Sequence, residues 1–86
     1  MQFRGAVMKE QGIIFAVIMV KEQVVRNSFE AMTTRRVFQT VFTGLPIVLM
    51  AEGPSGRAIY DGRDDITGVL SHLPVNAIPF KQYTIS

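Results

Sequence analysis

The chain has 86 residues, of which 48% are hydrophobic and 19% charged, a composition typical of one folded domain rather than of a disordered chain. Nine basic and seven acidic side chains leave a formal charge of +2, too small an excess to indicate nucleic-acid binding by itself. The absence of cysteine and the single histidine, His72, exclude disulfides, thiol chemistry and metal sites built from cysteine or several histidines. We expect one globular domain over residues 1–86, located in the cytoplasm and without a cofactor.

The N-terminal part of the chain predicts two strands. Residues 3–8 form the first, and KEQG (residues 9–12) is typical of a hairpin loop. The apolar run over residues 13–20 is too short to cross a membrane as a helix, which takes about 20 residues. Because it is rich in Ile, Val and Phe, it favours a strand. We predict that this strand is buried on both faces and continues raggedly toward Val25.

An amphipathic helix is predicted next. Asn27 and Glu30 have the spacing of a capping box, and Gly44 and Pro46 are typical of a helix end. Steps of 100° per residue place one set on the inner side: Ala31, Thr34, Val37, Phe38, Val41, Phe42 and Leu45. The outer side carries Phe29, Met32, Arg35, Arg36, Gln39 and Thr43.

The second half of the chain predicts two strands, a helix and a last strand. Residues 46–51 (PIVLMA) are a second apolar strand, GPSG (residues 53–56) turns the chain, and residues 57–60 return as a more polar strand. A helix is expected from about Asp64 to Leu73, with Ile66, Val69, Leu70 and Leu73 facing the core and Pro74 ending it. Residues 78–85 supply a last strand, whose Pro79 suits a strand start or a sheet edge.

The predicted order is ββαββαβ with two helices, which indicates an α+β or small α/β domain with a single mixed sheet. The two continuous apolar runs, residues 13–20 and 46–51, are expected to be central and parallel. The alternative is a ferredoxin-like split βαββαβ fold with an extra N-terminal strand. In that alternative, residues 46–51 would lie at the edge and residues 57–60 in the centre.

The segments GLPIVLM, GPSG, RAIYDG and ITGVLSHL together resemble the closing strand–hairpin–helix half of thioredoxin-like domains. The resemblance covers about a third of the chain and lacks the Cys-x-x-Cys of the redox members. It implies no functional residue.

Charged residues and glycines concentrate over residues 53–72. Asp61, Asp64 and Asp65 could hold Mg²⁺ or Ca²⁺, but capping of the following helix by Asp64 or Asp65 is the simpler interpretation. Arg57 and Arg63 could contact an anion.

Gly68 is expected to face outward between Asp65 and His72, leaving a notch that a ligand or partner could approach. The predicted contact residues are therefore Asp65, Gly68, His72, Arg57 and Arg63. We expect no catalytic and no metal-binding residue. Ser71 and His72 are adjacent, and side chains of adjacent helical residues point in different directions.

The sequence favours a small non-catalytic binding domain that associates with a protein partner or with itself. The expected pairing surfaces are the backbone edges of two strands, residues 3–8 and residues 78–85. One alternative is a nucleic-acid or phosphate-ligand binding protein that uses Arg35, Arg36, Arg57 and Arg63. A second is a small enzyme whose carboxylates lie near Asp61–Asp65, for example Glu52 with Asp61. No membrane partner is expected.

Overall fold

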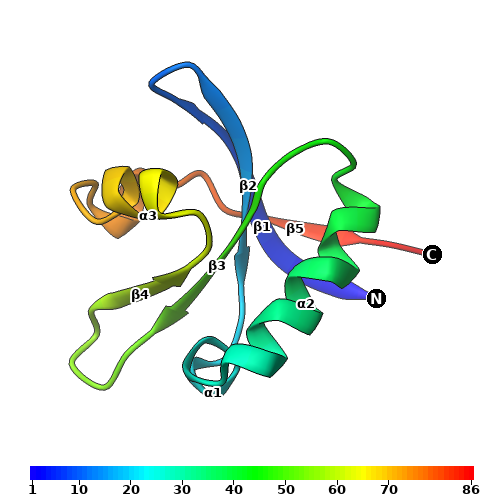
Figure 1. The fold of residues 1–86 in the computed structure, drawn as a ribbon, viewed down its shortest axis with the longest axis horizontal. Coiled ribbons are helices and arrows are strands. Elements are labelled where there is room, and N and C mark those ends of the chain that lie inside the picture. The colour runs from blue at the N-terminus through cyan, green and yellow to red at the C-terminus, as the bar shows by residue number, and fades with distance from the viewer.

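The computed structural model describes all 86 residues and contains one five-stranded sheet with helices on both faces (Figure 1). The elements in chain order are β1 (Gln2–Glu10), β2 (Ile13–Met19), α1 (Glu22–Arg26), α2 (Ser28–Val41), β3 (Ile47–Glu52), β4 (Ala58–Asp61), α3 (Asp64–Leu70), the 3₁₀ turn η1 (Val75–Ala77) and β5 (Lys81–Thr84). The strand order across the sheet is β4-β3-β2-β1-β5, with β2 and β3 parallel and the other pairs antiparallel. The predicted α+β class with a single mixed sheet is confirmed.

The parallel pair β2 and β3 forms the apolar interior of the sheet. Val17 lies opposite Val48, and Ile18 lies opposite Leu49. All four side chains are fully buried, because helices cover the sheet on both sides. This confirms that the two apolar runs are interior strands of the sheet and parallel. The prediction that residues 13–20 are buried on both faces is wrong at Ile14, which lies in the hairpin and is 48% exposed. The ferredoxin-like alternative is wrong, since β3 is interior and β4 lies at the edge.

The helices α2 and α3 lie on opposite faces of the sheet (Figure 1). One hydrophobic cluster lies under each of them. The α2 face holds Phe3, Ala16, Ile18, Ala31, Phe38, Ile47 and Leu49. The α3 face holds Ala6, Phe15, Val17, Val48, Met50, Ile66, Leu70 and Ile78. Successive strand residues point to opposite faces, so each interior strand contributes to both clusters.

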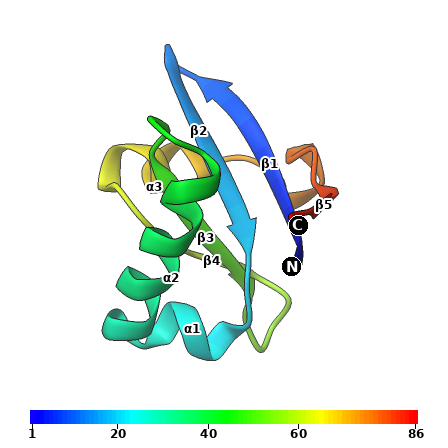
Figure 2. The same cartoon turned by 90° about the vertical axis from the view of Figure 1, so that its right-hand side faces the viewer.

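The β1–β2 hairpin extends beyond the helices (Figure 2). Its turn is made by Gln11 and Gly12, which have φ angles of 51° and 81°. The predicted hairpin is confirmed, but the loop is shorter than residues 9–12, since Lys9 and Glu10 belong to β1. One expectation for this region is wrong: residues 3–8 are not a sheet edge, because β1 pairs with β2 on one side and β5 on the other.

The first helical region differs from the prediction in two ways. The residues expected to continue β2 toward Val25 instead form the short helix α1, which turns the chain from the sheet into α2. Within α2, Asn27 caps the N-terminus as expected, since its Oδ1 accepts a hydrogen bond from the Glu30 N–H at 3.0 Å. Ala31 and Phe38 are buried, but Val37, predicted to face the core, is 48% exposed.

The C-terminal part has shorter elements than expected. α3 ends at Leu70 and not at Leu73, although Leu73 still packs against the α3-face cluster. Within residues 78–85, only β5 forms a strand. Ile78 instead ends η1 and packs into the core. Residues 78–80 therefore connect η1 to β5 without forming a strand, and β5 pairs with the outer side of β1.

Candidate functional site

The connection from β4 to α3 positions most of the residues that the sequence singled out. Asp61 ends β4 and Asp64 begins α3. Gly62 lies between them and packs closely against β3. A Cβ added at Gly62 would lie 2.9 Å from Val48 Cγ2. Because only glycine fits there without a shift of β3, the start of α3 is held close to the sheet.

An acidic hollow of about 550 Å³ lies between the β1–β2 hairpin and α3. Its lining residues are Glu10, Gln11, Asp64, Asp65, Gly68, Val69, His72 and Leu73. The structure thus brings together Asp65, Gly68 and His72, and a Cβ added at Gly68 would meet nothing within 4 Å. The sequence did not indicate Glu10 as a contact residue, because only the tertiary fold brings the tip of the β1–β2 hairpin close to α3. Binding at this hollow stays a prediction.

Asp65 already has partners within the chain. Arg63 donates two hydrogen bonds to its carboxylate, from Nε at 3.2 Å and from Nη2 at 2.7 Å. These bonds lower the pKa of Asp65 below its ordinary value and raise the pKa of Arg63. The expected capping is wrong in detail: Arg63 occupies the N-cap position, and Asp65 accepts from the Ile66 N–H within the first turn. Arg63 is therefore engaged by a carboxylate.

The carboxylates do not assemble into a metal site, since no three His, Asp or Glu side chains gather in a geometry that could hold a metal ion. The pair Glu52 and Asp61 is also separated. Alternation along the antiparallel pair puts Glu52 on the α3 face and Asp61 on the α2 face, where Asp61 forms an ion pair with Arg35. This pair links α2 to the edge strand β4.

Ser71 and His72 come closer than expected because both side chains turn back onto the Gly68 carbonyl. Ser71 Oγ and His72 Nδ1 each lie 2.8 Å from that oxygen, and 3.4 Å from each other. A carbonyl oxygen only accepts, so Nδ1 carries the proton in this arrangement. Nδ1 therefore cannot take a proton from Ser71, and the geometry does not make Ser71 a nucleophile activated through that nitrogen.

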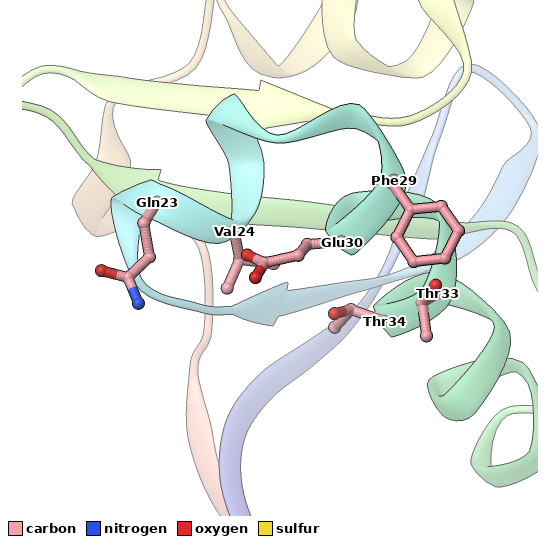
Figure 3. A pocket seen from close by; sticks show the side chains of 6 residues that line it. All are labelled: Gln23, Val24, Phe29, Glu30, Thr33 and Thr34. Carbon is pink, nitrogen blue, oxygen red and sulfur yellow. The ribbon is translucent and has the colours of Figure 1, made fainter.

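A second hollow, of about 350 Å³, lies where α1 meets α2 (Figure 3). Gln23 and Val24 come from α1; Phe29, Glu30, Thr33 and Thr34 come from the first turns of α2. The Phe29 side chain projects from α2 (Figure 3) and is 70% exposed. The sequence placed Phe29 on the outer side of the helix, but it gave no signal for the hollow, which depends on α1.

A third hollow, of about 320 Å³, lies between β4 and the end of α3 and was missed by the sequence reasoning. Its lining residues are Arg57, Ala58, Tyr60, Leu70, Ser71, Leu73, Pro74 and Val75. Arg57 therefore lies apart from the acidic hollow that contains the other predicted contact residues. The Tyr60 hydroxyl is buried and has no hydrogen-bond partner, and burial raises the pKa of Tyr60 above its ordinary value.

The sheet has two open edges, β4 and β5. At β5, Ile85 and Met1 exchange hydrogen bonds in both directions at the end of the ladder with β1. Hydrogen-bonded and non-hydrogen-bonded pairs alternate along an antiparallel ladder, so the backbone N–H and C=O groups of Gln82 and Thr84 point away from β1. The edge predicted over residues 78–85 is therefore present over β5.

None of the helices has both the length and the apolar character needed to span a bilayer. No family model, no curated protein and no solved structure matches the chain.

Proposed function

We propose that the protein is a small binding domain of the cytoplasm that pairs with a second copy of itself through β5. The observation that carries the proposal is the open backbone edge of this strand, where Gln82 and Thr84 direct N–H and C=O groups outward. A second β5 related by a two-fold axis can pair with these groups in an antiparallel ladder, which is one established way in which an exposed edge binds a partner.

The side chains around β5 support pairing with a copy rather than open-ended association. On the α2 face, Tyr83 stacks on Phe3 with ring centroids 5.0 Å apart, and both Tyr83 and Ile85 remain half-buried. A second copy would cover this exposed apolar surface. The Lys81 ammonium lies 5.1 Å from the centre of the Tyr83 ring. A two-fold arrangement is closed and uses each β5 once.

The decisive variant is Thr84→Pro, because proline removes the outward N–H of Thr84 without removing a bond to β1. Thr84→Val is the matched control, since it keeps that N–H and is a good strand former. Light scattering after size exclusion at a series of concentrations should give a dimer for the parent chain and for Thr84→Val, and a folded monomer for Thr84→Pro. A monomeric parent chain, or an unchanged dimer in Thr84→Pro, would contradict the proposal.

The arrangement of the arginines does not favour the nucleic-acid alternative. Arg35 and Arg63 are engaged by Asp61 and Asp65, and Arg57 lies in a different hollow from Arg63. Two measurements over a range of salt separate these functions: dimerisation through backbone pairing should persist in salt, whereas binding of an added oligonucleotide through phosphate contacts should weaken steeply.

A further inference from the structure

The edge strand β4 has backbone groups that no part of the chain pairs with. The Gly53 N–H donates to the Arg57 carbonyl, and this pair continues the antiparallel register in which Glu52 lies opposite Ala58. Hydrogen-bonded and non-hydrogen-bonded pairs alternate along such a ladder, so the N–H and C=O groups of Ala58 and Tyr60 point away from β3. Neither residue makes a backbone hydrogen bond outside the ladder. β4 can therefore accept a further strand.

The hollow between β4 and the end of α3 adjoins this edge. Ala58 and Tyr60 are its two lining residues from a strand, and none comes from β3, the neighbouring strand. Both side chains lie on the α3 face, because Tyr60 lies opposite Met50, which belongs to the cluster of that face. Side chains of a strand added to β4 would alternate in the same way. Those opposite Ala58 and Tyr60 would therefore lie on the side of the hollow.

The walls of the hollow suit an apolar side chain. Five of the eight lining residues are hydrophobic, and the volume is about 320 Å³. One of them, Val75 of η1, is 40% exposed, so apolar surface remains for an occupant to cover. Because an apolar cavity of about 150 Å³ already holds benzene, there is room for a side chain as large as leucine. An open edge beside such a pocket combines the two elements of strand addition, in which main-chain hydrogen bonds supply affinity and pockets for alternate side chains supply specificity.

Two other occupants fit this edge less well. In an antiparallel pair of β4 strands from two copies, the side chains on the α3 face would again be Ala58 and Tyr60. Both already pack against the cluster of their own chain, so a second copy has no side chain to place in the hollow. A small apolar molecule would fill the hollow but leave the outward N–H and C=O groups of β4 unpaired. The occupant therefore has an extended backbone and brings its own apolar side chain.

The charges along β4 add a polar requirement. Arg57, just before the strand, is exposed and takes part in none of the ion pairs of the structure. Asp61, at the other end of β4, is already engaged by Arg35, and Glu52 lies one strand further in. The free charge on the outer strand is therefore positive, and it favours a carboxylate in the occupant near Arg57.

We propose that β4 and this hollow form a docking site for an extended segment of a partner protein. The segment adds to β4 as an antiparallel strand, places an apolar side chain in the hollow opposite Tyr60 and carries a carboxylate opposite Arg57. The site lies at the opposite edge of the sheet from β5. It is therefore independent of the proposed dimer and can be tested in the Thr84→Pro variant as well as in the parent chain.

The probe is the blocked peptide acetyl-TTLTVE-amide, which in this register puts leucine opposite Tyr60 and glutamate opposite Arg57. Amide resonances are followed in a ¹H–¹⁵N spectrum during titration, and saturable shifts are expected at Ala58, Tyr60 and Val75. Replacing the leucine by serine should weaken binding about tenfold or more, since the apolar contact is lost. N-methylation of the leucine, whose N–H faces β4, should do the same. N-methylation of the following threonine, whose N–H points away, is the matched control and should leave the affinity unchanged.

Two pairs of substitutions test the edge and the hollow separately. Ala58→Pro removes an outward N–H without removing a bond to β3 and should weaken binding of the peptide at least tenfold, whereas Ala58→Ser keeps that N–H and should bind normally. Val75→Asp places a charge in the hollow and should also weaken binding at least tenfold. Val37→Asp, at a valine of α2 that is 48% exposed, is its control and should bind as the parent chain does.

Three results would overturn the proposal. The first is the absence of saturable shifts at β4, and the second is equal binding of the two N-methylated peptides, which does not depend on any protein variant. The third is a lower molecular mass in solution for Ala58→Pro than for Ala58→Ser, which would assign the β4 edge to a second copy of the chain.

Discussion

Tyr60 is the residue that packing alone accounts for least well. Its ring contributes to the α3-face cluster, but its hydroxyl is buried without a partner. A phenylalanine would supply the same ring without the desolvated oxygen. The hydroxyl therefore opposes the stability of the folded chain.

Replacing Tyr60 by phenylalanine should raise the free energy of unfolding by about 1 kcal/mol at pH 7, since an unsatisfied buried donor is removed. The effect should grow in alkali. Burial raises the pKa of Tyr60 above its ordinary 10.0, so near and above pH 10 the unfolded chain loses the phenolic proton while the folded chain keeps it, and stability falls. Tyr60→Phe removes this loss.

Urea denaturation of both chains between pH 7 and pH 11 measures the two effects. Tyr83→Phe, which also removes a tyrosine hydroxyl, controls for the general influence of tyrosine ionisation. A Tyr60→Phe chain less stable than the parent at pH 7 would show that the hydroxyl has a hydrogen-bond partner in the folded protein.

At the scale of single elements, α2 packs against the sheet through one face, and this face decides which of its residues are buried. Its capping residue Asn27 is local and was predictable, as was the burial of Ala31 and Phe38. Phe38 packs edge-to-face against Phe3 of β1, with ring centroids 4.8 Å apart. Val37, one residue earlier, belongs to the predicted inner face but lies away from the sheet. Only the docking angle of the helix separates these neighbours.

The two phenylalanines of α2 should therefore differ sharply in their effect on stability. Phe38→Ala leaves a cavity in the α2-face cluster and should lower the free energy of unfolding by about 3–5 kcal/mol. Phe29→Ala, at a position that is 70% exposed, should change it by about 0.5 kcal/mol or less. Thermal and urea unfolding of both variants checks the contrast. A large loss in Phe29→Ala would instead show that the hollow between α1 and α2 is filled by contacts that stabilise the monomer.

On the scale of the whole molecule, the sheet divides the protein into a protected interior and two open edges. The paired central residues of β2 and β3 are covered on both faces, whereas β4 and β5 each have one free side. An 86-residue chain buries only a moderate fraction of its surface, so stability gained from a second copy is significant for a domain of this size. The free edge at β5 and the half-buried side chains beside it are where such a gain is available.

Hydrogen exchange should follow this arrangement. Amides of Val17 and Leu49, in the interior pair, should be among the most protected, while the outward amides of Gln82 and Thr84 should exchange rapidly in dilute protein. Raising the concentration through the monomer–dimer range should slow exchange at Gln82 and Thr84 but leave the interior amides unchanged. Rapid exchange at Thr84 in a demonstrated dimer would place the interface elsewhere than β5.

The sequence by itself determined the elements whose signals are local. The two uninterrupted apolar runs specify the buried parallel pair because only strands covered on both faces lack alternation; Asn27 and Gly12 mark the helix start and the hairpin turn by their own conformational preferences. It also placed Gly68 between Asp65 and His72 on an open face, because helical spacing fixes that relation.

The tertiary structure alone decided which residues from distant elements meet. Nothing local indicates that β1 is interior, since its partner β5 comes from the other end of the chain, or that residues 22–26 turn into α1 where the sheet ends. The pairing of Arg35 with Asp61, the approach of Glu10 to α3 and the enclosure of the Tyr60 hydroxyl depend on the packing of separate segments. Periodicity assigns a side chain to a face of its own element, but burial and hydrogen bonding are set by what the fold places against that face.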